Sequence, residues 1–145
     1  MKKVIIFGSS GGLGSYLSKK LKGYYLIYPI GKIKKKYKVN LLIKNEVDKL
    51  VRRINPDIII NCVASTSVDR CINDYNYAFK GNVTTAQNIV HAIKKLTKKI
   101  HLIHISTDQV YNSKMFCKNK ESQINLSNNY SKTKFLAEQK IKKIS

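Results

Sequence analysis

The chain has 145 residues, enough for one folded domain, and 43% of them are hydrophobic, enough for a buried core. Its net charge is +20, but the lysines occur as dispersed pairs without interleaved aromatic residues, so we expect no dedicated nucleic-acid site. No run approaches the ~20 apolar residues of a membrane span. The three cysteines form no C-x-x-C pair, which argues against a zinc site and structural disulfides. We therefore expect a soluble, cytoplasmic protein.

The first predicted element is a strand that leads directly into a glycine-rich turn and a helix. The apolar run 4–7 predicts a buried strand, and residues 8–14 read G-S-S-G-G-L-G. Gly8 permits a sharp turn, Gly11 lets a pyrophosphate approach the backbone, and Gly14 lets the helix lie close to the sheet. The free N–H groups at the helix start would bind the pyrophosphate. The pattern indicates a dinucleotide site, although an ordinary strand–turn–helix joint would also fit it.

The rest of the chain alternates between strands and helices. Gly23 is predicted to end the first helix and Pro29 the second strand. Further strands are predicted at 24–28, 57–64 and 100–105, helices at 45–54, 75–95 and from about 129 onward, and loops at 31–38, 65–69 and 112–128. The alternation is typical of an α/β protein with a Rossmann-type doubly wound parallel sheet. We predict the strand order 3-2-1-4, with helices on both faces.

Two further patterns carry chemistry. Tyr130 and Lys134 are four residues apart on the last helix and therefore share one face. An ammonium close to a phenol favours its ionised form, which suits proton transfer, although this spacing is also common for structural reasons. Thr107 follows the fourth strand at its carboxyl end, where a hydroxyl could bind a substrate carbonyl or simply cap a turn.

The glycine turn, the strand-end Thr107 and the Tyr130–Lys134 pair follow one another in this order along the chain. With this order, the sequence resembles the extended short-chain dehydrogenase/reductase family. Within it, the likeness is to the dTDP-4-dehydrorhamnose reductase branch of sugar-nucleotide reductases. Besides the glycine turn and the Y-x-x-x-K pair, the resemblance rests on residues 55–64 (NPDIIINCVA), 66–69 (TSVD), 81–83 (GNV) and 106–111 (STDQVY). It extends from Lys3 to about Ile141.

The resemblance implies a coenzyme site and a catalytic group. The implied coenzyme-binding residues are Gly8, Ser10, Gly11, Gly12, Leu13, Gly14, Asn40, Leu41, Ala64, Thr66, Tyr130 and Lys134. Tyr130 would protonate the reduced carbonyl oxygen, Lys134 would hold the nicotinamide ribose, and Thr107 would bind the carbonyl. Asn82 is expected to tie its helix to a strand rather than to touch ligand. No metal is implied.

The sequence departs from the family at the adenosine end of the site. Asn40 stands where the family usually has an Asp near the adenine, and no acidic residue ends the second strand. Lys32 could instead meet a 2′-phosphate, which favours NADP over NAD.

Family members carry about as many residues again after the Tyr–Lys helix. Those residues supply the remaining strands and the sugar-nucleotide pocket, so the fourth strand here would present a bare apolar edge. We therefore expect residues 1–145 to be an incomplete, C-terminally truncated Rossmann domain without a substrate domain. Such a chain could come from a truncated reading frame, a degenerate gene or a split enzyme. Its partners would be a complementing second-half chain or further copies of itself.

The leading hypothesis is an NAD(P)-dependent reductase of a nucleotide-linked 4-keto sugar, of the kind used in polysaccharide biosynthesis, or a remnant of one. Whether this chain is an active enzyme stays open, because the substrate-binding half is missing. The alternatives are a sugar-nucleotide epimerase or dehydratase, a non-catalytic dinucleotide-binding module, and a basic nucleic-acid binder.

Overall fold

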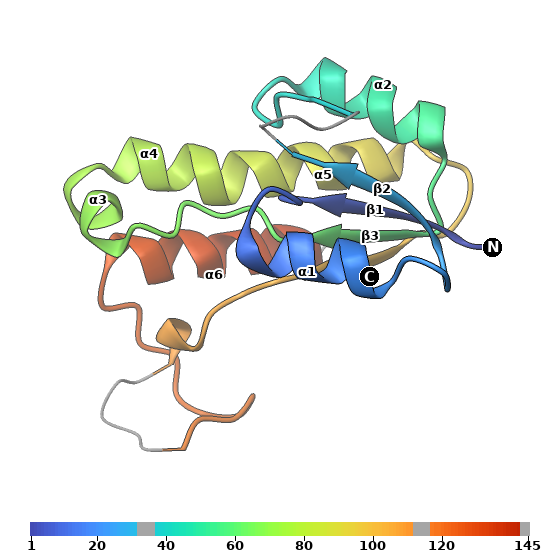
Figure 1. The fold of residues 1–145 in the computed structure, drawn as a ribbon. Coiled ribbons are helices and arrows are strands. Elements are labelled where there is room, and N and C mark those ends of the chain that lie inside the picture. Colours follow the sequence, from blue (N-terminus) through green and yellow to red (C-terminus); the bar gives the residue numbers. More distant parts are fainter. Residues whose placement is uncertain (32–36, 112–116, 143–145) are drawn as a thin grey trace.

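The computed structural model describes residues 1–31, 37–111 and 117–142 as a parallel sheet with helices on both faces (Figure 1). The strands are β1 (Lys3–Phe7), β2 (Leu26–Ile30), β3 (Ile58–Asn61) and β4 (His101–His104). The helices are α1 (Gly12–Lys20), α2 (Lys44–Ile54), α3 (Val68–Asn73), α4 (Tyr75–Phe79), α5 (Thr85–Lys94) and α6 (Asn129–Lys142). The predicted α/β class and Rossmann-type architecture are confirmed. Within these described ranges, no helix has the length and apolar character needed to cross a bilayer.

The strand order is β2-β1-β3-β4, so the predicted order 3-2-1-4 is wrong. β1 lies in the middle, with Ile5 opposite both Tyr28 of β2 and Ile59 of β3. The place beside β2 is taken by the chain that follows it, because Tyr37 forms a parallel bridge with Ile30. The preference for right-handed crossovers fixes the hand of a connection but not the side of β1 on which the next strand is added. The alternation of strands and helices therefore does not determine the strand order.

Pro29 lies inside β2, opposite Ile6, and does not end the strand as predicted. The N–H of Leu26 donates to the carbonyl of Lys2 at 3.0 Å, so by alternation the nitrogen of residue 29 faces away from β1. A proline is tolerated there because its missing N–H breaks no bond to β1, and on the other side of β2 the described residues form only the isolated bridge between Ile30 and Tyr37.

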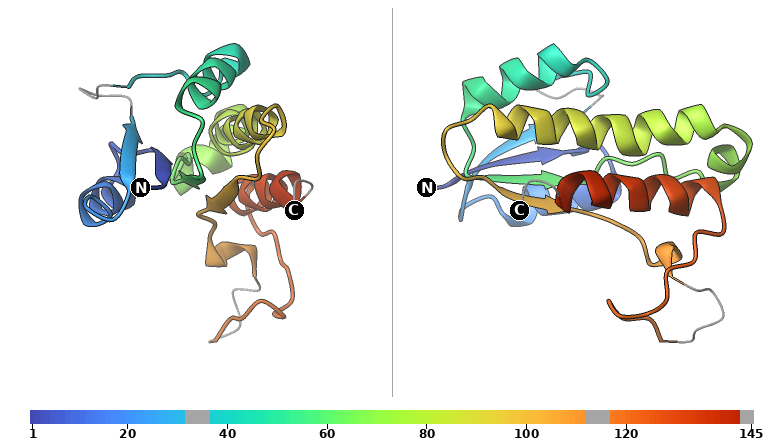
Figure 2. Two further views of the ribbon diagram at one scale, coloured as in Figure 1. Left: turned by 90° about the vertical axis from the view of Figure 1, so that its right-hand side faces the viewer. Right: turned by 180° about the vertical axis from the view of Figure 1, so that it is seen from behind.

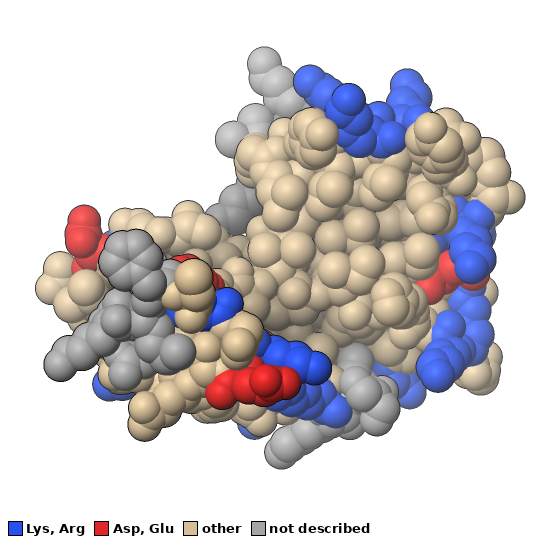
Figure 3. Space-filling model, turned by 90° about the horizontal axis from the view of Figure 1, so that it is seen from below, with Lys and Arg blue, Asp and Glu red and all other residues tan. Residues whose placement is uncertain are grey.

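The larger core lies between the sheet and the pair α2 and α5, which with α6 cover one face (Figure 2). Its fully buried members include Ile5, Phe7, Val47, Val51, Ile59 and Ile89. The predicted helix at 45–54 is confirmed by α2. The opposite face has a smaller core of Val4, Ile6 and Ile60, beside which α1 packs on β1 and β2. Seen from the side of β4, the molecule shows a broad uncharged face framed by Lys and Arg (Figure 3).

The predicted helix at 75–95 is three helical segments in series, because a π-helical turn, η1 (Lys80–Thr84), separates α4 from α5. At this turn the backbone passes very close to the loop after β3. A Cβ placed on Gly81 would lie 1.9 Å from Ser65 Oγ, so only glycine fits there. That loop, predicted to be irregular over 65–69, already begins α3 at Val68. The last predicted helix is confirmed as α6.

The turn between β1 and α1 depends on two glycines that touch each other. Gly8 has φ +82°, a left-handed conformation that favours glycine. A Cβ on Gly14 would lie 2.3 Å from the carbonyl oxygen of Gly8, whereas one on Gly12 would meet nothing within 4 Å. The first turn of α1 therefore lies directly against the end of β1.

We expect Gly14→Ala to lower the free energy of unfolding by about 1–3 kcal/mol, because the added methyl group meets backbone that cannot move independently. Gly12→Ala is the matched control on the same helix, and we expect it to be neutral or to stabilise by up to ~1 kcal/mol. Urea unfolding followed by circular dichroism measures both. Equal stabilities of the two variants would contradict the close approach at Gly14.

Candidate active site

Two adjoining cavities lie at the carboxyl ends of the strands, where open parallel sheets bind their ligands. They share Gly8, Gly11, Cys62 and Ala64. The smaller has a volume of about 330 Å³ and is bounded also by Gly12, Leu13, Gly14, Thr66, Ile105, Ser106, Tyr130 and Lys134. The larger has about 1030 Å³ and continues from Ser10 past β2 toward Lys38, Asn40, Leu41, Glu46, Tyr77 and Lys80.

The structure brings all predicted coenzyme-site residues to these two cavities. The glycines, Ala64, Thr66, Tyr130 and Lys134 line the smaller one, and Ser10, Asn40 and Leu41 line the larger one. Their contacts with a coenzyme stay a prediction. Because the two cavities share lining residues at the glycine turn, their arrangement suits one elongated ligand that extends from Asn40 to Tyr130.

Thr107 lies outside the lining of both cavities. Its Oγ1 instead accepts a hydrogen bond from the backbone N–H of Gln109 at 3.2 Å and so caps the short 3₁₀ helix η2 (Asp108–Val110). The residue before it, Ser106, lines the smaller cavity. The substrate contact predicted for Thr107 is untested, and Ser106 is a lining hydroxyl that sequence reasoning missed.

Other lining residues were missed as well. Cys62 and Ile105 follow β3 and β4 directly, and the strand-end rule could have found both. At the other end of the site, Lys32 lies outside the described residues. Lys38, which the sequence gave no reason to single out, is exposed and lines the larger cavity.

The start of α1 has the features of a pyrophosphate-binding turn. Its N-cap residue, Gly11, makes no side-chain capping bond, and the first turn carries no acidic residue. The N–H groups and the positive end of the helix dipole are therefore open to an anion. A Cβ on Gly8 would lie 3.0 Å from the backbone of Cys62, so the turn is shaped by close backbone contact. This cradle fits the diphosphate of a dinucleotide.

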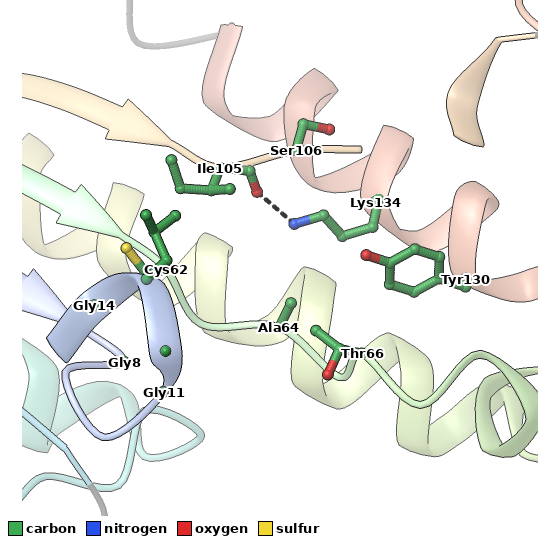
Figure 4. Close-up of a pocket in the computed structure, with 12 residues that line it drawn as sticks. Gly8, Gly11, Gly14, Cys62, Ala64, Thr66, Ile105, Ser106, Tyr130 and Lys134 are labelled. Carbon is green, nitrogen blue, oxygen red and sulfur yellow. Dashed lines mark hydrogen bonds between the residues drawn. The ribbon is translucent and has the colours of Figure 1, made fainter. Parts of the chain in front are cut away.

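Helix α6 carries Tyr130 and Lys134 to the opposite wall of the smaller cavity (Figure 4). Both are largely buried, with 9% and 2% of their surfaces exposed. The Lys134 Nζ donates a hydrogen bond of 2.5 Å to the carbonyl oxygen of Ile105 at the end of β4. A phenol and an ammonium thus share one small, largely enclosed cavity with the glycine turn.

Burial sets the electrostatics around Lys134. It lowers the pKa of Lys134 from its usual value, and the nearby Glu138 carboxylate and Cys62 thiol oppose that change. Burial, reinforced by the charge of Lys134, also lowers the pKa of His104 to about 4. His104 is therefore neutral near pH 7, and its Nδ1 lies 3.0 Å from Nδ2 of Asn61. Burial also raises the pKa of the Cys62 thiol, so Cys62 is neutral at that pH as well.

Asn82 connects the loop after β3 to α6, whereas the sequence predicted that it would tie its helix to a strand. Its side chain is 1% exposed and belongs to the π-helical turn η1. The Oδ1 atom accepts from the N–H of Ser65 at 2.7 Å, and Nδ2 donates to Oγ1 of Thr133 at 2.9 Å. Thr133 directly precedes Lys134 on α6, so this amide couples the position of the Tyr–Lys helix to the loop after β3.

Known proteins are similar to this chain in sequence and in fold. The spore coat polysaccharide biosynthesis protein SpsK of Bacillus subtilis is 33% identical over 116 residues, which are 79% of this chain and 38% of SpsK. A UDP-glucose 4-epimerase of Mycoplasma pneumoniae is 33% identical over 104 residues, or 69% of this chain and 31% of that protein. The solved structure of a dTDP-4-dehydrorhamnose reductase from Bacillus anthracis, in complex with NADP, matches with a TM-score of 0.87 and 30% identity.

The match to the Bacillus anthracis structure covers 98% of this chain and 49% of that one. The chain thus spans about half the length of that reductase, and less of the two curated relatives. The family model for the RmlD substrate-binding domain matches residues 1–145. The chain belongs to the RmlD substrate-binding domain family.

Proposed function

We propose that the chain forms the coenzyme-binding and proton-donating part of an NAD(P)-dependent reductase of a nucleotide-linked 4-keto sugar. The observation that carries this proposal is the presence of Tyr130, Lys134 and the glycine turn around one cavity. The similarity to a dTDP-4-dehydrorhamnose reductase, solved with NADP, supports both the reaction and the coenzyme.

Each part of the site has a separate role in reducing a carbonyl group. The open N-terminus of α1 would hold the diphosphate of a nicotinamide coenzyme, and the larger cavity beside Asn40 would hold its adenosine. Such a coenzyme would supply the hydride for the carbonyl carbon. Tyr130 donates its hydroxyl proton to the carbonyl oxygen, which completes the alcohol. Lys134 stabilises the negative charge left on the phenol oxygen, and solvent returns the proton to Tyr130.

Recognition of the sugar nucleotide needs residues beyond those that line the two cavities. In this proposal they belong to polypeptide that pairs with β4, next to Ile105 and Ser106. Across the described part of the chain, β4 pairs only with β3, and Ile103 is 39% exposed. An unpaired strand edge presents backbone N–H and C=O groups to which another strand can bond, so this edge fits a complementing chain segment.

A sugar-nucleotide 4-epimerase is the second candidate, because the Mycoplasma pneumoniae relative has that name. An epimerase would use the same phenol to remove a proton from a sugar hydroxyl and return it. It would consume no coenzyme overall, whereas a reductase oxidises one NADPH per sugar. Following coenzyme absorbance during turnover distinguishes the two.

We expect the purified chain to bind NADPH more tightly than NADH, because Lys38 lines the adenosine end and no carboxylate ends β2. Lys38→Ala is expected to weaken NADPH binding about tenfold, as for the loss of one charged hydrogen bond, and to leave NADH binding nearly unchanged. Isothermal titration calorimetry measures both constants. Lys49→Ala, an exposed lysine of α2 outside both cavities, is the control. Absence of heat with either coenzyme would refute the coenzyme site.

We expect Tyr130→Phe to reduce turnover of a dTDP-4-keto sugar by roughly 10²- to 10⁴-fold, because the variant lacks the donated proton. NADPH affinity should stay close to that of the parent chain, since the ring still fills its place. The assay follows NADPH oxidation with dTDP-4-dehydrorhamnose.

Tyr24→Phe removes an equivalent hydroxyl from a residue that is 78% exposed and serves as the control for Tyr130→Phe. Undiminished turnover in Tyr130→Phe would exclude this residue as the proton donor. Coenzyme binding without turnover of any sugar nucleotide, even with a complementing second-half polypeptide present, would favour a non-catalytic module.

A further inference from the structure

One acidic side chain beside the site has no place in the scheme above. Glu138 lies on α6 one helical turn beyond Lys134 and is half-buried. Its carboxylate accepts a hydrogen bond from the hydroxyl of Ser106, a residue that lines the smaller cavity. Acidic residues are rare in this chain, with eight against 28 basic ones, so a carboxylate beside the site is not expected from composition alone.

Two neighbouring residues at the end of β4 are thus held by two neighbouring turns of α6. Ile105 is held through its carbonyl oxygen by Lys134, and Ser106 is held through its hydroxyl by Glu138. Fixing Ser106 fixes the peptide plane that precedes it, and with it the oxygen that Lys134 contacts. We propose that Glu138 is a positioning residue for Lys134, acting through Ser106 on the carbonyl group of Ile105.

The charges around Lys134 support this role. Among the described residues, the titratable groups that face it are Cys62 just after β3, His104 from β4, and Tyr130 and Glu138 from its own helix. Burial raises the pKa of Cys62 and lowers that of His104 to about 4, so both are neutral near pH 7. Glu138 therefore supplies the negative charge of this group, and it opposes the effect of burial on the pKa of Lys134.

A purely structural link between α6 and β4 would also explain the Ser106–Glu138 hydrogen bond. Its loss would then lower stability and leave the titration of Lys134 unchanged. Positioning predicts something different, because removing the carboxylate or releasing the Ile105 carbonyl each disfavours the charged ammonium. The decisive measurement is therefore the pKa of Lys134 itself.

The test is an NMR titration of the full 145-residue chain with ¹³C-labelled lysine, without coenzyme or substrate. The Lys134 signal is assigned by its loss in Lys134→Arg. We expect Glu138→Gln to lower the pKa of Lys134 by about one unit, equivalent to a tenfold change in its proton affinity. Glu138→Asp keeps the charge and should restore most of the difference. Glu121→Gln, which removes an exposed carboxylate next to Lys120, should leave Lys134 unchanged.

Ser106→Ala provides a second route should Glu138→Gln fail to fold. It keeps the carboxylate but removes the link, and we expect the pKa of Lys134 to fall in this variant as well. An unchanged Lys134 pKa in the folded variants, with only stability reduced, would overturn the inference.

The inference rests on the proposed function only in giving Lys134 a catalytic role. The effect of Glu138 on Lys134 and the reductase function can therefore be refuted separately. The titration needs no coenzyme, and its failure leaves the reductase assay intact. Absence of NADPH binding would conversely refute the proposed function and leave the measured pKa standing. With turnover, the alkaline limb of the pH profile of kcat/KM should move to lower pH in Glu138→Gln, because Lys134 then loses its proton at lower pH.

Discussion

The buried amide of Asn82 is the constraint on which the site depends. It satisfies the backbone N–H of Ser65 on one side and the hydroxyl of Thr133 on the other. A buried polar group left without its partner costs about 1–3 kcal/mol, so both contacts hold their segments firmly. The π-helical turn at Lys80–Thr84 brings the amide into this position, and Gly81 lets the turn approach Ser65. This one side chain therefore ties the Tyr–Lys helix to the loop that follows β3.

Local features of the fold were predictable from the sequence, and their assembly was not. The strand–glycine–helix opening and the helix over Lys44–Ile54 follow from spacing that each segment carries in itself. The strand order does not, because an apolar run such as Ile58–Ile60 is equally suited to either side of β1. Pro29 inside β2 shows the same limit, since the tolerance of a proline depends on which side of the strand is paired.

The site was predictable where a motif carries its own geometry. The glycine turn and the four-residue spacing of Tyr130 and Lys134 each define a local shape, and both line the predicted cavity. Thr107 and Ser106 differ by one position, and a one-residue shift at a strand end exchanges a cavity-lining hydroxyl for a capping one. Glu138 was missed because its partner is 32 residues away in sequence, on another element. Contacts of that kind follow from tertiary packing alone.

Part of the net charge of +20 lies at the end of the fold opposite the site, whereas Lys38 and Lys80 line the larger cavity. Basic residues fill the last turns of α1, α2, α5 and α6, among them Lys19, Arg53, Lys94 and Lys142. In a parallel α/β fold these helix ends gather at the amino edge of the sheet, away from the two cavities. There they complement the helix dipoles and attract anions at long range. Chemistry at the carboxyl edge depends instead on the buried Lys134, whose neighbours Cys62 and His104 are neutral near pH 7. A lysine at these helix ends can be replaced without affecting the chemistry of the site. Replacing one of the few groups that face Lys134 affects that chemistry directly.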